Sequence, residues 1–244
     1  MATLTEGKAG VVAVITFTLN AAIGDVLVVW GGVSATAHPL TASITGGTGA
    51  ASGGFASLDQ FDGAANSGTF LAATMTTAGT PVATLNDTLG GTINCGGWIV
   101  KGVQATAQIT SPNTGNSAAN PLTASGSPSA GTNIFAAWFN ANTNNFTSFV
   151  LSGTTDFSTA AGTLNIDGGS LLNQAAGTYA FGANANPGDA QATLMTLYLA
   201  SSVIPVPTQR SSLRRVEDII GEAEDEGRFN ELDVKHWFRE GLFA

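Results

Sequence analysis

The hydrophobic pattern of this chain consists mainly of short apolar runs of strand length. The clearest run is residues 26–30, Val-Leu-Val-Val-Trp, which follows Gly24-Asp25 and precedes Gly31-Gly32. Five consecutive apolar residues between turn formers predict a strand that is buried on both faces and ends at the double glycine. Residues 98–103 and 193–199 have a similar apolar character and predict companion strands in the same core.

Alternating stretches predict half-buried strands around this core. Residues 14–19 place Ile15, Phe17 and Leu19 on one face and threonines on the other. Further strands are predicted at 70–76, 82–85, 105–110, 134–139, 146–151, 163–166, 178–181 and 190–199. About ten to twelve short strands at this spacing are typical of an all-β fold, here an antiparallel β-sandwich of the jelly-roll kind.

Glycine and polar residues define the expected connections. Residues 31–68 and 111–132 are poor in large apolar side chains, so they predict weak strands and long polar loops. Three large apolar side chains are expected to anchor the first of these regions: Phe55, Leu58 and Phe61. Gly102 predicts a bulge within a strand that continues past residue 103. Residues 140–145 predict the turn between a neighbouring pair of strands.

The composition narrows the possible partners. Charged residues make up only 10% of the chain, and its formal net charge is −9. Nucleic acids and anionic membranes are bound by clustered Lys and Arg, and residues 1–209 carry two lysines against eight acids, so we expect neither partner. The single Cys95 cannot form an internal disulfide and is expected to be a buried free thiol. Residues 9–35 are apolar but interrupted by Asn20 and Asp25, so they predict neither a membrane span nor a signal peptide.

The composition changes after residue 200. Residues 201–209 contain Pro205 and Pro207 and predict an extended linker between a β-domain, residues 1–200, and a tail. The tail, residues 210–244, holds 15 of the 25 charged residues and predicts two short α-helices with apolar stripes. Because such helices are marginal alone in water, we expect them to pack on the sandwich, on each other or on a partner. The predicted docking residues are Val216, Ile220, Val234, Trp237, Phe238 and Leu242.

The sequence offers few candidates for catalysis. It has no Gly-x-Ser-x-Gly, P-loop or His-Glu-x-x-His motif, and its two histidines are His38 and His236. His38 in a Ser/His/Asp site is one alternative, but a solvated loop residue is the favoured interpretation. Asp59 and Asp62 are candidates for a carboxylate pair or, like Asp167, for Ca²⁺ ligands, although Asp59-Gln-Phe-Asp62 more simply predicts a turn. We therefore expect a non-enzymatic protein with no catalytic residue, no cofactor and no metal site.

The tryptophans of the apolar strands have two possible roles. Trp30, Trp98 and Trp138 are expected to pack in the core, as aromatic residues in apolar strands usually do. The alternative is a platform on which sugars stack, with hydrogen bonds from the asparagines of residues 140–145. Because asparagine tolerates left-handed backbone conformations, turns are the favoured interpretation of those asparagines.

Four stretches together resemble a known group of domains. They are residues 19–30 (Leu-Asn-Ala-Ala-Ile-Gly-Asp-Val-Leu-Val-Val-Trp), residues 97–103 (Gly-Trp-Ile-Val-Lys-Gly-Val), residues 178–181 (Thr-Tyr-Ala-Phe) and a closing strand at 190–200. Over roughly residues 10–200 the chain resembles the β-sandwich domains of phage virion proteins, found in tail fibres, head fibres and related surface proteins, and of some bacterial adhesins. The Gly-Trp-Thr segment that usually lies between the first two motifs is missing, so no binding residue is carried over.

The resemblance implies a structural virion protein of a tailed phage or phage-like particle. The sandwich would be displayed on the particle surface, where it decorates the particle or serves host attachment, and the tail would bind other virion proteins. We expect a homo-oligomer, with a trimer favoured, made in the host cytoplasm. The alternative is a receptor- or carbohydrate-binding module that binds a host surface glycan, as part of a tail fibre or as an adhesin on a bacterial cell surface.

Overall fold

The computed structural model describes residues 12–201 except 36, 63–65, 102, 110–112, 115–121, 141–147, 151–154, 162–163 and 185–191. These residues all belong to one compact unit, Met1–Ser202. They form seventeen β-strands and no helix, and every strand pairing is antiparallel. The described part of the chain is therefore all-β, as the sequence predicts, with more strands than the ten to twelve expected.

The strands have the following bounds: β1 Val12–Thr16, β2 Val26–Val33, β3 Leu40–Gly47, β4 Ala50–Ala51, β5 Ala56–Asp62, β6 Ser67–Thr77, β7 Pro81–Asp87, β8 Ile93–Val100, β9 Val103–Ile109, β10 Asn113–Thr114, β11 Leu122–Gly126, β12 Thr132–Asn140, β13 Ser148–Val150, β14 Thr155–Ala161, β15 Leu164–Gln174, β16 Tyr179–Asn184 and β17 Ala192–Ser201.

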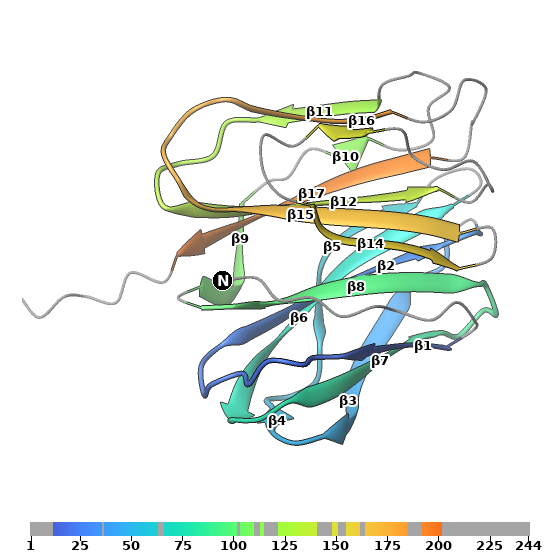
Figure 1. Ribbon diagram of the computed structural model, residues 1–244, viewed down its shortest axis with the longest axis vertical. Helices are drawn as coiled ribbons and strands as arrows, with labels where there is room; N and C mark the ends of the chain where they lie inside the picture. The colour runs from blue at the N-terminus through green and yellow to red at the C-terminus, as the bar shows by residue number, and fades with distance from the viewer. Residues whose placement is uncertain are drawn as a thin grey trace, which may run out of the picture. The chain divides into compact units, whose positions relative to one another are not determined.

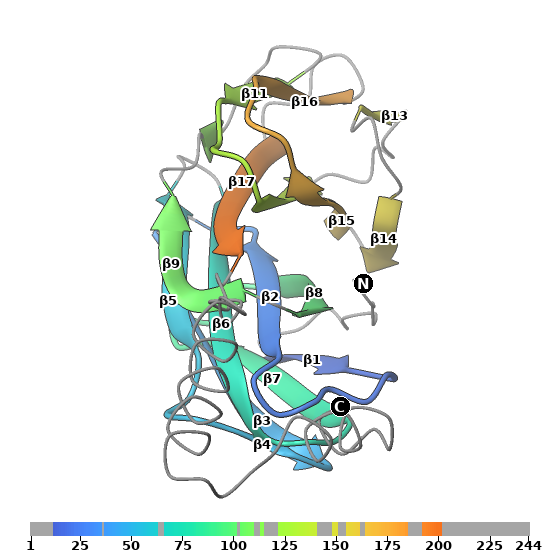
Figure 2. The same cartoon turned by 90° about the vertical axis from the view of Figure 1, so that its left-hand side faces the viewer.

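Four sheets pack face to face in layers (Figure 1). The outer sheet has the order β1-β7-β3, and the central sheet has the order β4-β6-β2-β8 with β5 also paired to β6. Next comes a six-stranded sheet, β10-β17-β12-β15-β14 with β9 also paired to β17, and then a distal sheet, β11-β16-β13. The view turned by 90° shows the same succession of layers (Figure 2).

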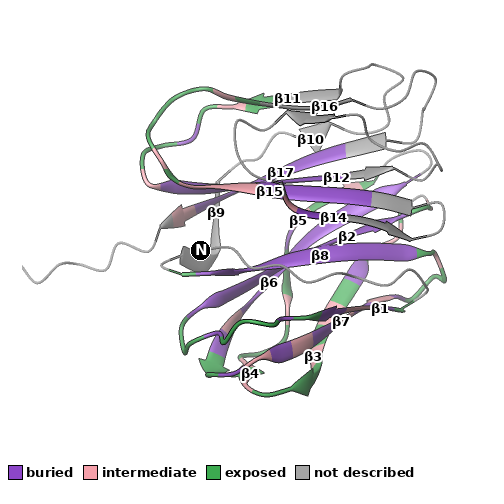
Figure 3. Ribbon diagram, in the orientation of Figure 1, coloured by how far each residue is buried: buried purple, intermediate pink, exposed green. Residues whose placement is uncertain are grey.

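Three strands of the central sheet, β2, β6 and β8, are largely buried on both faces (Figure 3). Alternate residues of β2 enter two different apolar clusters, because successive side chains of a strand point to opposite faces. Val28 and Trp30 belong to the inner core, which lies between the central and six-stranded sheets. Leu27 and Val29 belong to the outer core, which lies between the central and outer sheets. This confirms the prediction of a strand that is apolar on both faces.

The double glycine after this run does not end the strand. Gly31 and Gly32 lie inside β2, which continues to Val33. A methyl group on Gly31 would lie 2.8 Å from Leu85 Cδ2 and would also meet Leu40, so glycine at this position makes room for the outer core. The prediction of a turn here was wrong because the glycine is needed for close packing rather than for backbone freedom.

A second close approach explains two more strand glycines. Gly96 of β8 and Gly168 of β15 both face the ring of Phe157, which is buried in the inner core. Methyl groups at these two positions would lie 2.7 Å from Phe157 Cε1 and 2.8 Å from Phe157 Cε2, respectively. The central and six-stranded sheets therefore hold the Phe157 ring between glycines.

The alternation at the start of the chain ends earlier than predicted. Ile15 and Phe17 are buried as expected, but Leu19 is 46% exposed. The pairing of β1 with β7 ends at Thr16, and Ala21 then bridges to Gly79. Leu19 consequently lies in the connection after β1 and not on the buried face of a longer strand.

The region expected to be mostly loop contains real strands. Residues 31–68 include β3, which joins the outer sheet, and β5, which joins the central sheet. The three predicted anchors hold this region in place: Leu58 is buried in the inner core, Phe61 packs against that core, and Phe55 packs against the outer core. This stretch has few large apolar side chains, and pairing of β3 with β7 and of β5 with β6 holds it in the sheets.

Three predicted connections differ in the structure. The strand containing Trp98 ends at Val100, and β9 begins at Val103 in the six-stranded sheet, so the chain changes sheets there instead of forming a bulge. Residues 111–132 contain β10 and β11. The predicted pair across 140–145 does not form, because β12 pairs with β15 and β17 whereas β13 pairs with β16.

The predictions for the end of the chain fall outside the described residues. They concern the linker at residues 201–209 beyond Ser201 and the helical docking segment at residues 210–244. The predicted docking residues Val216, Ile220, Val234, Trp237, Phe238 and Leu242 all lie in that segment.

Candidate functional site

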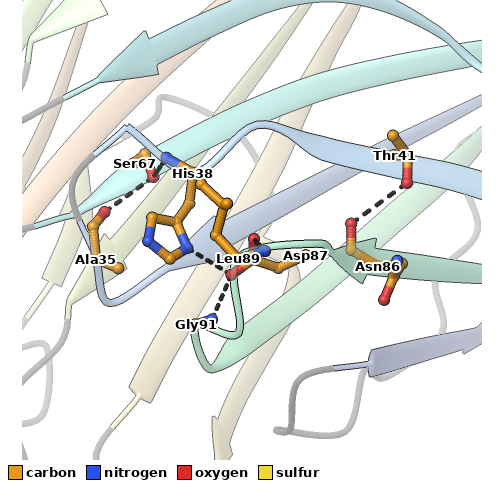
Figure 4. A network of polar contacts seen from close by, with 8 residues as sticks. All are labelled: Ala35, His38, Thr41, Ser67, Asn86, Asp87, Leu89 and Gly91. Atoms are coloured by element: carbon orange, nitrogen blue, oxygen red, sulfur yellow. Dashed lines mark hydrogen bonds and ion pairs between the residues drawn. The ribbon is translucent and has the colours of Figure 1, made fainter.

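A histidine and an aspartate that are far apart in sequence meet at one end of the outer sheet. Asp87 is the last residue of β7 and pairs with Leu40 at the start of β3. His38 lies two residues before Leu40, so the antiparallel register brings its ring to the Asp87 carboxylate (Figure 4). The strand register therefore brings the two side chains to the same end of the sheet.

The two side chains form a short polar contact that is largely shielded from water. His38 Nδ1 lies 2.6 Å from Asp87 Oδ2, and the side-chain exposures are 16% and 0%, respectively. The same carboxylate accepts a hydrogen bond from the Leu89 backbone N–H to Oδ1 at 3.0 Å and another from the Gly91 backbone N–H to Oδ2. Asp87 thus fixes the β7–β8 turn in the manner of an Asx-turn and holds the His38 loop against it.

These contacts determine the protonation of Asp87. Burial by itself would raise the pKa of the carboxyl group, because it disfavours the charged form. Hydrogen bonds from His38, Leu89 and Gly91, together with the nearby imidazole charge, act in the opposite direction and hold the pKa of Asp87 below its ordinary value. The carboxylate is therefore the stable form of this buried group at neutral pH.

Gly91 is required for this arrangement. A methyl group at its α-carbon would lie 2.6 Å from Asp87 Oδ2 and 2.9 Å from His38 Nδ1. Any larger residue at this position would push the turn away from the carboxylate. The absence of a side chain at Gly91 therefore allows the backbone to approach the pair closely.

Ser67 completes the composition of a Ser/His/Asp site but not its geometry. Its Oγ accepts a hydrogen bond from the His38 backbone N–H at 3.2 Å and donates one to the Ala35 carbonyl at 2.9 Å. A nucleophilic serine instead requires a hydrogen bond to the imidazole nitrogen opposite the one that contacts the aspartate. Ser67 fastens the loop backbone to β6, and the His38–Asp87 pair fastens the same loop to the β7–β8 turn.

Asp59 and Asp62 do not form a carboxylate pair. Both lie in β5, which corrects the prediction of a turn. Residues three apart in a strand point to opposite faces of the sheet, so the two carboxylates diverge. Asp62 instead accepts hydrogen bonds from Gln60 Nε2 at 2.9 and 3.0 Å. The geometry of β5 therefore supports neither glycoside cleavage nor a shared Ca²⁺ ion at these two residues.

Asp167 also lies within a strand rather than in a loop. It belongs to β15, is only 6% exposed and pairs in register with Trp138 on one side and Ser158 on the other. Across the residues that the structure describes, no group of three or more His, Cys, Asp and Glu side chains could hold a metal ion.

The three strand tryptophans are core residues, as predicted. Trp30, Trp98 and Trp138 are all 0% exposed. Trp98 packs with Phe135 and Phe157 at ring-centroid distances of 5.2 and 4.9 Å. Such buried rings cannot provide a platform for sugars.

The polar partner of Trp98 is not evident from the sequence. Its Nε1–H donates to Asp156 Oδ2 at 2.7 Å, and the Ser170 hydroxyl donates to the same oxygen at 2.6 Å. Alternation in β14 would place Asp156 on the face opposite the buried Phe157, but the register of β14 against β15 is irregular between Thr155 and Phe157, so the sequence carries no signal for this contact. The contact satisfies the indole N–H of a buried tryptophan, which is the usual reason for such a partner.

Cys95 has the properties expected of a structural thiol. It is free and completely buried in the outer core. Burial raises the pKa of its thiol to about 12, because the thiolate is poorly solvated there.

Comparison with known proteins gives no assignment. No protein-family model matches the chain, and neither a curated protein nor a solved structure shows a significant match. Within the described strands and turns, we find no helix with the length and apolar character needed to cross a membrane.

Proposed function

We propose that the chain is a non-enzymatic structural protein of a tailed phage or phage-like particle. In this proposal the β-rich part is a jelly-roll-like sandwich displayed on the particle surface. The helical segment at residues 210–244 attaches it to other virion proteins, with Trp237 and Phe238 as central contacts.

The observation that carries this proposal concerns the two stretches with the strongest resemblance to virion domains. The first stretch ends in β2 and the second begins in β8, and these two strands pair over eight residues. The two motifs therefore lie in neighbouring strands of one sheet. This arrangement is expected if both motifs belong to a single domain of the virion type. The low charge of the body is also in keeping with a protein that works by packing against other proteins.

The arrangement of the polar residues supports a structural role over an enzymatic one. His38, Asp87 and Ser67 have the composition of a catalytic triad, but each is used to fasten a loop. The buried tryptophans likewise favour a structural protein over a glycan-binding module that relies on them for stacking. Receptor binding through other residues is the alternative function, and the experiments must distinguish it from a purely structural role.

The proposal is tested by particle association. The protein should be found in purified particles at a fixed copy number. Replacing Trp237 and Phe238 together with Ala should abolish incorporation while the melting temperature of the isolated chain stays within about 2 °C, because aromatic anchors dominate many interfaces. The matched control, Lys235 and Arg239 both replaced with Ala, should still be incorporated.

Two results would contradict the proposal. One is normal incorporation of the double aromatic variant, which would remove the anchor. The other is absence of the protein from particles combined with saturable binding to host cells or to a glycan array, which would favour the receptor-binding alternative.

A further inference from the structure

The strand β8 is the last strand on one side of the central sheet. It pairs with β2, and no strand that the structure describes pairs with its other edge. Even so, every residue of β8 is buried, whereas β5 on the opposite side of the sheet has exposed residues, including Ser57 and Asp62. Buried backbone groups are nearly always hydrogen-bonded, so the second edge of β8 requires a partner.

The hydrogen bonds around β8 show which backbone groups form this edge. The Ser34 N–H donates to the Thr92 carbonyl just before β8, so in the antiparallel register every second residue after Thr92 bonds to β2. The N–H of an intervening residue, Cys95, accordingly donates to the Asn94 side chain. We call the open edge the side of β8 to which the backbone groups of the intervening residues point, among them Cys95, Gly97 and Ile99.

The sequence of β8 does not protect the open edge. Edge strands of soluble proteins commonly carry charged residues, often Lys, or proline, which prevent pairing with other chains. The strand reads Ile-Asn-Cys-Gly-Gly-Trp-Ile-Val and contains none of these residues. Its composition is that of a strand with neighbours on both sides.

The chain before β1 approaches the central sheet beside this edge. β1 lies next to β8 (Figure 1), and a methyl group on Gly97 would be 3.2 Å from Phe17 Cζ, just after β1. Val12 pairs with Asn86, close to the turn that leads from β7 to Ile93 at the start of β8. β1 and β8 consequently run in the same direction, with Val12 nearest Ile93.

The preceding residues have the length needed to reach along the open edge. Eleven residues of the sequence precede Val12 and lie outside the described residues. Gly7 and Gly10 are turn formers, and a reversal there leads residues 2–6, Ala-Thr-Leu-Thr-Glu, along β8 in the antiparallel direction. At about 3.3 Å per residue these residues span about 17 Å, which matches the length of Cys95–Ile99.

The charges of the same segment suit an outer position. Glu6 and Lys8 lie at the end of residues 2–6 and in the turn that follows. If residues 2–6 pair with β8, these two side chains lie at the new edge of the sheet, where charged residues prevent further pairing. The protection that β8 lacks is therefore present in the segment that precedes β1.

We propose that residues 2–6 form the edge strand of the central sheet by pairing with the open edge of β8 in the same chain. The open edge binds an extended segment through its backbone, as in other cases of strand addition. The position of Val12 favours the chain's own segment over that of a second copy. The inference goes beyond the virion role, because it concerns the isolated chain and holds whichever assembly contains it.

Amide hydrogen exchange of the parent chain gives the first test. The N–H groups of Gly97 and Ile99 face the open edge, whereas those of Gly96 and Trp98 bond to β2 and are internal controls. The Gly97 and Ile99 amides should exchange at least about 100-fold more slowly than in an unstructured chain. Rapid exchange of these two amides with the controls still protected would overturn the proposal.

Two proline variants test the pairing itself. Neighbouring residues of a strand direct their N–H groups to opposite sides, so only one of Leu4 and Thr5 donates to β8. Proline removes the N–H and is tolerated where that group faces solvent. One of Leu4→Pro and Thr5→Pro should therefore speed exchange at Gly97 and Ile99 at least about 10-fold, and the other should not.

The internal controls show whether each variant is folded, since the Gly96 amide should stay protected in both. Equal effects of the two prolines, or no effect of either, would contradict a paired strand. If one variant does not fold, exchange in the parent chain still decides the proposal.

Mixing distinguishes the chain's own segment from that of a second copy. Isotope-labelled chains of the disruptive proline variant are mixed with an excess of unlabelled parent. Slow exchange at Gly97 should not return in the labelled chains, because each parent chain keeps its own segment. Its return would assign the strand to another copy and overturn the proposal. Particle incorporation is measured separately, so failure here leaves the proposed virion role to its own experiment.

Discussion

Val28 of β2 lies opposite Trp98 of β8 in the central sheet, and both side chains are completely buried in the inner core. The pair joins two strands that are about 70 residues apart in the sequence, near the middle of the molecule. Its burial makes this position sensitive to charge.

Val28→Asp should therefore destabilise the fold strongly. It places an unpaired carboxylate in an apolar cluster, at a cost of at least about 3 kcal/mol in the free energy of unfolding. Urea unfolding followed by tryptophan fluorescence measures the change. The control is Ser57→Asp at an exposed position of β5, which should stay within about 0.5 kcal/mol of the parent. Equal stabilities of the two variants would show that the assignment of β2 is wrong.

Gly96→Ala should displace the Phe157 ring. Both groups are buried and the ring is rigid, so we expect a loss of about 1–3 kcal/mol. Gly46→Ala is the control, because its methyl group would have no neighbour closer than 3.8 Å. In a Phe157→Leu background, Gly96→Ala should cost at least about 0.5 kcal/mol less, since the clashing ring is gone. Strict additivity in this double-mutant cycle would contradict the packing described.

Asp87→Asn should destabilise the protein more at neutral pH than in acid. The folded-state pKa of Asp87 is lowered, so its carboxylate stabilises the fold above the unfolded-state pKa and loses this effect as pH falls through the folded pKa. We expect a difference from the parent of about 1.5–3 kcal/mol at pH 7 that shrinks below about pH 4. Chemical unfolding at both pH values measures it, with Asp62→Asn as the exposed control. A difference that is the same at pH 7 and pH 3 would rule out this role of the charge.

Cys95 should be unreactive in the folded protein. With a thiol pKa of about 12 and no solvent exposure, it should not react with a disulfide reagent at pH 8. Denaturant should expose it and give one thiol per chain. As a positive control, Ser57→Cys adds an exposed thiol that should react in the native state. Rapid reaction of the parent would place Cys95 outside the core.

Local sequence patterns account for the parts of the fold that depend on side-chain alternation. The apolar run at residues 26–30 predicts a strand without a solvated face, and the structure has one. The apolar strands also predict that Trp30, Trp98 and Trp138 are core residues, and all three are buried. The change of sheet between β8 and β9 was not predicted, because a strand pattern in the sequence does not specify which sheet the strand joins.

Glycines and long-range pairs could not be assigned from local patterns. Gly31 resembles a turn residue in the sequence, and no role was predicted for Gly96; their roles depend on Leu40 and Phe157, which reach them only in the folded chain. His38 and Asp87 are 49 residues apart, and their contact depends on the register of β3 against β7. Information of this kind lies in the tertiary contacts and not in any single segment.

The doubly buried central sheet also has a consequence for cooperativity. If the outer sheet detached alone, Leu27, Val29 and Leu71 would be exposed to water, and if the six-stranded sheet detached, Val28, Trp30 and Phe70 would be exposed. Either partial opening thus removes half of the burial that holds β2 in place. The two cores should therefore melt in a single transition, and amide hydrogens of β2 should exchange only through global unfolding.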